Sequence, residues 1–162
     1  MVRLIFFAFV LGLLSACQSA QPIDPKDLAS ARFFLEGGDG VTGLKVVLPQ
    51  SAVNLGVNPK PVLTEGDILD VELMQVDLGK CLMFQLRPAA ARDFYRLSGT
   101  HQGRRLVLMI DDEAMGARRI DGAIADGRIF IFVEKPDSDL PALVARLKRS
   151  SLAIQRELAR KG

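Results

Sequence analysis

Residues 84–110 constrain the fold more than any other stretch, because they encode a strand, a helix and a second strand in direct succession. Leu82, Phe84 and Leu86 alternate with less apolar residues, which is the period of a half-buried strand. Pro88 stops that strand and suits the first position of a helix, since proline has a helical φ and lacks the N–H that a first turn leaves unpaired. We therefore expect a helix to begin at Pro88.

The expected helix has one apolar stripe, because Ala90, Phe94 and Leu97 recur at helical spacing. Gly99 and Gly103 are the nearby residues that adopt left-handed backbone geometry without penalty, so the helix is expected to end between them. One face of this helix should therefore pack on a sheet.

The strand predicted over residues 104–110 is apolar on both faces, with Leu106, Leu108 and Ile110 on one side and Val107 and Met109 on the other. A strand of this kind is usually central in its sheet and covered twice. Two alternatives follow for its second face. Either the N-terminal strands and residues 51–61 cover it, which we favour, or part of it is an exposed patch for a partner.

Shorter apolar periods predict the other elements. Their expected positions are a hairpin of strands at 32–36 and 44–48, an irregular wrap at 51–61, strands at 67–77, 114–120 and 128–134, and a last helix capped by Asp137 or Ser138. After residue 61 the order is ββαβββα. We therefore predict an α+β fold, a two-layer sandwich with two helices on one face of a mostly antiparallel sheet, plus the short N-terminal strands.

Residues 1–16 are expected to be a signal peptide and no part of the fold. Arg3 is followed by an apolar run that is shorter than the roughly 20 residues of a spanning helix. The residues Leu14-Ser15-Ala16-Cys17 resemble a bacterial lipobox, which implies a diacylglycerol on the Cys17 sulfur and cleavage after Ala16. The alternative is an ordinary secretory signal with an incidental cysteine.

The lipobox implies a cell-envelope protein that faces the periplasm. Gln18 after the lipidated cysteine favours the outer membrane over the inner one in many lipoproteins. Residues 17–30 would then be a tether, residues 31–60 the N-terminal hairpin and wrap, and residues 61–162 the main domain with its basic helix. A chain of 162 residues is long enough for one domain of this kind.

Few residues of the chain are arranged for catalysis. His101 has no second histidine with which to share a metal, and the acids at 111–113 are explained as a turn. Cys81 is expected to be a packed small hydrophobe, because no histidine or acidic pair stands near it in sequence. A formal net charge of +2 gives no reason to expect a nucleic-acid partner. We expect no enzyme, no cofactor and no metal.

Two further features are typical of binding proteins. An edge strand accepts an extended polypeptide by strand addition. The last helix is strongly basic, which favours anionic lipid head groups if it lies near the anchor, or else reflects a solvated face and cations near a helix C-terminus. Its cations are Arg146, Lys148, Arg149, Arg156, Arg160 and Lys161.

The order of motifs resembles the periplasmic head subdomain of SecD, a subunit of the preprotein translocase. That family has a P-V-L-T-x-x-D-I/L motif, a hairpin, the pattern L-x-P-x-x-A-x-x-F-x-x-L-T, and then G-R/K-R/K-L-A-I-V-L-D-G with a following hairpin. The counterparts here are Pro61-Val62-Leu63-Thr64 with Asp67-Ile68, then Leu86, Pro88, Ala91, Phe94 and Leu97, then the run from Gly103 to Asp111. The similarity covers roughly residues 61–148.

The resemblance implies a small periplasmic module that contacts polypeptide or other proteins and performs no reaction. The transmembrane helices of SecD have no counterpart after Cys17, so no motor role follows. The family's glycine-rich hairpin corresponds to residues 121–132 and retains Gly122 and Gly127. We predict a lipid-anchored protein that binds polypeptide or protein partners in export or envelope assembly; the alternative is a scaffold lipoprotein with one fixed partner. The candidate partner-binding residues are Arg104, Arg105, Val107, Met109, Phe130 and Phe132.

Overall fold

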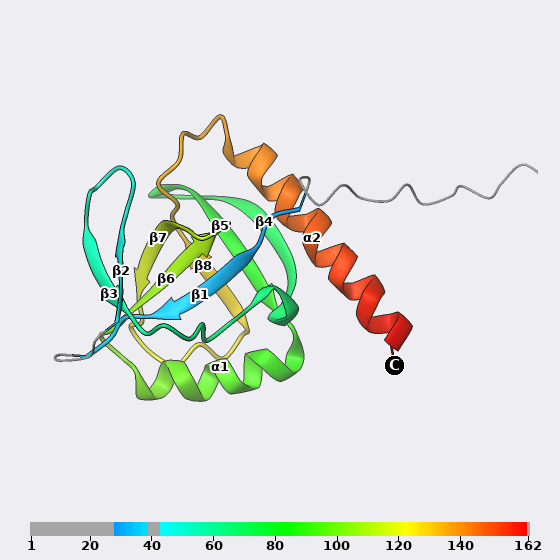
Figure 1. Ribbon diagram of the computed structural model, residues 1–162, viewed down its shortest axis with the longest axis horizontal. Coiled ribbons are helices and arrows are strands. Elements are labelled where there is room, and N and C mark those ends of the chain that lie inside the picture. The colour runs from blue at the N-terminus through cyan, green and yellow to red at the C-terminus, as the bar shows by residue number, and fades with distance from the viewer. Residues whose placement is uncertain (1–27, 39–42, 162) are drawn as a thin grey trace, which may run out of the picture.

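The computed structural model describes residues 28–38 and 43–161, and it confirms the α+β class and the antiparallel pairing (Figure 1). The elements in chain order are β1 (Ala31–Leu35), β2 (Leu44–Val47), β3 (Asn54–Val57), the 3-10 helix η2 (Glu65–Asp67), β4 (Ile68–Val76), β5 (Gly79–Leu86), α1 (Pro88–Thr100), β6 (Arg105–Ile110), β7 (Glu113–Arg119), β8 (Arg128–Ile131) and α2 (Leu140–Lys161). The strands are divided among three sheets, ordered β1-β6-β7, β4-β5-β8 and β2-β3. The signal peptide and Cys17 lie outside the described residues.

The central strand, helix and strand form as the sequence predicts. α1 begins at Pro88, ends among the expected glycines and buries Phe94. Ser98 on the same face is fully buried because its hydroxyl donates to the Tyr95 carbonyl and accepts the N–H of Ile124. This bond ties α1 to the segment between β7 and β8.

The main core lies between the two three-stranded sheets and is closed by both helices. Phe33 of β1 and Phe84 of β5 meet edge to face at its centre, with ring centroids 5.0 Å apart and an interplanar angle of 88°. Neither side chain is exposed to solvent. The first half of α2 packs on the same core through Leu143, Val144 and Leu147.

The hairpin predicted from residues 32–36 and 44–48 is wrong. β1 pairs with β6, from Ala31 opposite Ile110 to Leu35 opposite Leu106, and so lies within the main sheet. β2 pairs with β3, which falls in the segment expected to be irregular. In this position Phe33 and Leu35 of β1 lie in the main core, and Phe34 packs in a second core on the opposite face of the sheet.

The second face of the main sheet is covered, which is the alternative that the sequence favoured. The β2–β3 hairpin lies across this face, where Val46 and Leu55 pack on Phe34, Val107 and Met109 in a second, smaller core. The main sheet is therefore buried on both faces, by different parts of the chain.

The turn predicted at residues 111–113 is confirmed. Asp111 and Asp112 have left-handed φ values of 51° and 64° and join β6 to β7 as a two-residue hairpin loop. The Asp111 carboxylate also accepts the N–H of Ser30 at 2.9 Å and pairs with Arg146 at 2.8 Å. It thereby joins the start of β1 to α2.

α2 extends beyond the sheets at its C-terminal end (Figure 1). Its first residue is Leu140, slightly later than the predicted caps at Asp137 or Ser138. In its second half Leu152 and Leu158 are about half exposed. Among the described residues, no helix is long and apolar enough to cross a membrane.

Candidate functional site

Two of the predicted partner-binding residues are not accessible in the structure. Val107 is fully buried and Met109 is 8% exposed, because the β2–β3 hairpin covers this face of β6. The alternation of apolar residues along β6 correctly placed both side chains on the second face. It could not show which segment lies over them.

The predicted arginines have structural partners at one end of the same strand. Arg105 is exposed and pairs with Glu36 at 2.9 Å, while its backbone N–H donates to the same carboxylate. Arg104 is half-buried and lies near the Glu36 carbonyl. These contacts hold the end of β1 against β6.

The two predicted phenylalanines lie near β7. Phe130 is half-buried, and its carbonyl accepts a hydrogen bond from Arg118 at 3.1 Å. Phe132 is 43% exposed. Its carbonyl lies so close to Gly116 of β7 that a Cβ at that position would collide with it. The six predicted residues therefore do not form one surface, and of them Phe132 alone is an exposed large apolar side chain.

A groove of 560 Å³, called the β2–β7 groove below, lies between the edge of β2, the start of β7 and residues 134–136. Its apolar lining comes from side chains at the edges of the main core and of the second, smaller core. One of them is Met109, which the sequence analysis proposed as a partner-binding residue. The lining residues that matter here are Leu44, Val46, Val47, Pro49, Met109, Ala114, Met115 and Pro136. Leu44 and Val47 are each about half exposed, so the groove has an apolar and accessible wall.

The wall formed by β2 is an unpaired strand edge. Leu48, just beyond β2, donates its N–H to the carbonyl of Val53, so this pair is hydrogen-bonded. In an antiparallel ladder bonded and non-bonded pairs alternate, so Val46 and Leu44 also bond to β3. The N–H and C=O groups of Lys45 and Val47 therefore point to the opposite edge. No strand among the described residues pairs there.

Glu134 closes one end of the groove. Its carboxylate accepts the backbone N–H of Gln50 at 2.7 Å and that of Ser51 at 2.9 Å, and the Ser51 hydroxyl donates to it at 2.6 Å. These bonds fasten the β2–β3 turn to the segment that follows β8. Burial alone would raise the pKa of Glu134, but the hydrogen bonds from Ser51 and Gln50 outweigh burial and hold the pKa below its usual value.

Replacing Glu134 with glutamine is expected to lower the free energy of unfolding at neutral pH by no more than about 1 kcal/mol, the size of hydrogen bonds at an exposed site. Because the folded state lowers the pKa, the stabilisation is complete above the unfolded value of 4.5 and is lost as the pH falls through the folded value. Urea unfolding of both proteins should show a difference at neutral pH that vanishes in acid.

Glu72→Gln serves as the matched control for this prediction, because Glu72 is exposed on β4 and distant in sequence from the turn. The control should show no comparable pH-dependent difference. If the Glu134 difference persisted unchanged below the folded pKa, the proposed fastening of the turn by its carboxylate would be wrong.

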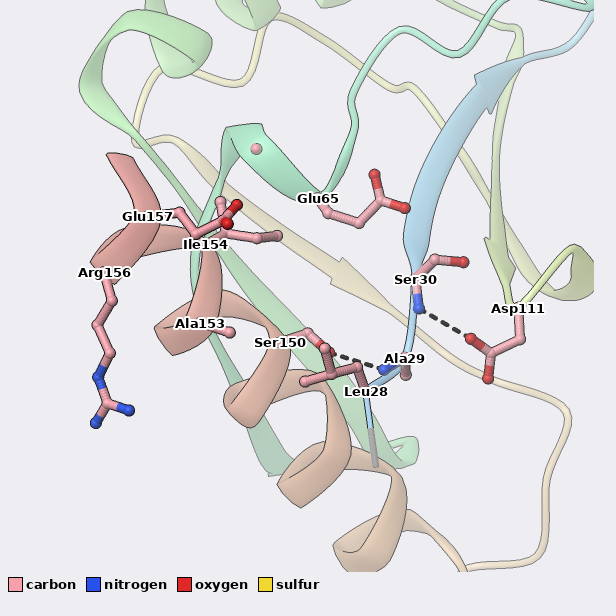
Figure 2. Close-up of a pocket in the computed structure, with 11 residues that line it drawn as sticks. Leu28, Ala29, Ser30, Glu65, Asp111, Ser150, Ala153, Ile154, Arg156 and Glu157 are labelled. Carbon is pink, nitrogen blue, oxygen red and sulfur yellow. Dashed lines mark hydrogen bonds between the residues drawn. The ribbon is translucent and has the colours of Figure 1, made fainter. Parts of the chain in front are cut away.

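A larger cleft of 850 Å³ lies where the described chain begins, between the second half of α2 and η2 (Figure 2). Leu28, Ala29, Ala153 and Ile154 give it an apolar lining. Its acids are already engaged, because Glu65 pairs with Arg32 at 3.0 Å and Asp111 pairs with Arg146 at 2.8 Å. Leu28, the first described residue, itself lines this cleft.

The structure also places His101 and Cys81, the two residues considered above for a metal-binding or thiol role. His101 caps the C-terminus of α1, where its Nδ1 lies 2.9 Å from the Leu97 carbonyl. Cys81 is buried; burial raises the pKa of its thiol, and the charge of Arg118 only partly opposes this. Within residues 28–38 and 43–161 no group of three or more potential ligands is placed to hold a metal ion.

No family model and no curated protein matches the chain, whereas solved structures do. The first is of SecDF, described as a membrane component that enhances protein export. It has a TM-score of 0.59 and 19% identity, over 75% of this chain and 62% of that chain. A structure of SecDF in a super-membrane-facing form also has a TM-score of 0.59 and 19% identity, over 74% of this chain and 18% of that chain.

A third similar structure is SecDF from Thermus thermophilus, described as a translocon-associated membrane protein. Its TM-score is 0.52 at 19% identity, over 77% of this chain and 20% of that chain. The chain thus spans less than two thirds of the first structure and about a fifth of the other two. These similarities show a SecD-like fold, as the order of motifs predicted.

Proposed function

We propose that this protein is a non-catalytic lipoprotein of the cell envelope that binds extended polypeptide segments at the β2–β7 groove, in support of protein export. The observation that carries the proposal is the unpaired edge of β2 along an apolar groove. A segment entering the groove would bond to Lys45 and Val47 of β2 as an added strand.

The groove suits an unfolded chain better than a folded partner. Backbone hydrogen bonds to a strand edge do not depend on side-chain identity, so they accept many sequences. Alternate side chains of an added strand would face the apolar lining supplied by Val46, Met109 and Met115. Lys45, Lys135, Glu113 and Glu134 line the same groove, so its polar groups have both signs of charge.

The envelope location is supported by the lipobox at residues 14–17, and the link to export by the fold shared with SecDF. On this proposal Cys17 anchors the protein to a membrane, with the outer membrane favoured by Gln18. The domain would then face the periplasm and receive polypeptides near that surface.

The variant Val47→Pro tests strand addition directly. Proline lacks an N–H, and at residue 47 the missing donor faces the unpaired edge, so the β2–β3 pairing is retained. We expect binding of a carboxymethylated, permanently unfolded model polypeptide to weaken roughly five- to thirtyfold, since one hydrogen bond of about 1–2 kcal/mol is lost. Fluorescence anisotropy of the labelled polypeptide measures this change.

Val47→Ala is the matched control, because alanine removes the same side chain and keeps the N–H. It should bind several times more tightly than Val47→Pro. Equal binding by the two variants would exclude a backbone bond from residue 47. A protein that binds no unfolded chain but one stable envelope partner would instead be the scaffold lipoprotein considered from the sequence.

A further inference from the structure

We propose that the exposed face of the second half of α2 docks on an anionic lipid bilayer and so orients the anchored domain. The occupant is the head-group layer of the membrane that holds the lipid anchor. This inference rests on the proposed lipidation of Cys17, and it adds a second contact between the protein and the membrane.

The docking face is an arginine stripe that includes an exposed leucine. Leu152, Arg156 and Arg160 recur at intervals of four residues and so lie on one side of the helix, which also carries Arg149. Leu152 is 50% exposed, and the side chain of Arg160 is 76% exposed. Arg156 contributes to the lining of the cleft, and Figure 2 shows its side chain extending from α2 away from β1. An apolar residue among cations is typical of helices that lie in a membrane interface.

The opposite face of α2 is the one that packs on the domain. Leu143 and Leu147 lie in the main core, and Ile154 lines the cleft beside Leu28. The core therefore sets the rotation of the helix and leaves the arginine stripe outward. Docking on a membrane would need no rearrangement of the fold.

The charges around the stripe favour an anionic surface. Among nearby acids, Asp70 is engaged by Lys148 at 3.3 Å, and Glu157 is 3.9 Å from Arg160 in an exposed pair. A pair of that kind contributes little in water and exchanges readily for another anion. Leu69 of β4 is 39% exposed and shares a hollow with Leu152, which extends the apolar part of the face.

The chain joins the domain at α2, on the side of the helix that packs on the domain. The Leu28 carbonyl accepts a hydrogen bond from Arg146 at 3.1 Å, and the Ala29 N–H donates to Ser150 at 2.7 Å. Both partners belong to α2. Cys17 precedes Leu28 by 11 residues, which reach at most about 36–40 Å. The stripe is therefore within reach of the bilayer to which Cys17 would be attached.

Hydrogen exchange of the full lipidated chain in vesicles tests the docking. The vesicles contain phosphatidylcholine alone or phosphatidylcholine with phosphatidylglycerol at about 30%, near the anionic fraction that attracts basic helices. We expect the amides of residues 152–161 to exchange up to about 25-fold more slowly in the anionic vesicles, since Arg156 and Arg160 would each favour docking by about fivefold. High salt should remove the difference.

Arg156→Gln/Arg160→Gln should abolish the protection. The matched control is Arg92→Gln/Arg96→Gln, which removes two exposed arginines at the same spacing from α1 and should keep it. Equal exchange in the two vesicle types would overturn the proposal, as would protection that survives in Arg156→Gln/Arg160→Gln. The mass of the N-terminal peptide from the same sample reports lipidation separately, so a missing anchor is distinguished from a missing docking contact.

Discussion

Replacing Phe84 with alanine is expected to lower the free energy of unfolding by about 3–5 kcal/mol, the range for removing a buried phenylalanine. The side chain is fully buried and meets Phe33 edge to face at the centre of the main core. Its loss would leave a cavity between the two three-stranded sheets, and would also remove the aromatic contact. Urea unfolding followed by circular dichroism measures the change.

Phe132→Ala is the control for this substitution, because it removes the same side chain from a position that is 43% exposed. We expect it to cost about 1 kcal/mol or less, in line with partial burial. If the two variants lost equal stability, the main core would not be organised around the contact between Phe33 and Phe84.

Replacing Cys17 with alanine is expected to abolish lipidation completely. On the lipobox proposal, Cys17 supplies the only sulfur of residues 14–17 for a thioether to diacylglycerol, and cleavage after Ala16 would follow that modification. Cells supplied with an alkyne fatty acid should label the wild-type protein and leave Cys17→Ala unlabelled. The variant should also retain residues 1–16, which intact mass spectrometry detects.

Cys81→Ala provides the matched control, since it removes the other cysteine of the chain. Cys81 is 1% exposed within β5, so its thiol is not available to a modifying enzyme in the folded protein. Labelling should therefore be unchanged in this variant. Labelling of Cys17→Ala at the wild-type level would show that the lipobox assignment is wrong.

Patterns among neighbouring residues were sufficient to predict the elements whose determining contacts are local in sequence. Pro88 and the stripe that includes Phe94 predicted the limits and the buried face of α1. The strands β4 and β5 and the turn at Asp111 and Asp112 followed from short patterns and turn residues. In each case the residues that determine the element are close together in the sequence.

Long-range pairing was not predictable in the same way. Phe33 lies opposite Leu108, which is 75 residues further along the chain. No local sequence pattern indicates that β1 pairs with β6. β3 was missed because Asn54 and Gly56 have low strand propensity, although Leu55 and Val57 alternate with them. β3 is held by its pairing with β2 and by the burial of Leu55 and Val57.

The candidate groove depends on both of these long-range choices. The run from Leu44 to Leu48 was recognisable as a strand, but which of its edges is free depends on β1 pairing with β6 and β2 pairing with β3. The same rearrangement places the β2–β3 hairpin over Val107 and Met109. Sequence patterns therefore identified an apolar second face of the main sheet. In the structure the β2–β3 hairpin covers that face, and the candidate binding surface is the free edge of β2.

The most direct test of polypeptide binding is photo-crosslinking in cells, with a photoreactive amino acid in place of Val47. Its control is the same probe in place of Leu78, which is 86% exposed in the turn between β4 and β5. We expect the probe at residue 47 to capture many different exported polypeptides, and the probe at residue 78 to capture few. A single recurrent adduct, or equal capture at the two positions, would contradict binding of extended chains at the β2–β7 groove.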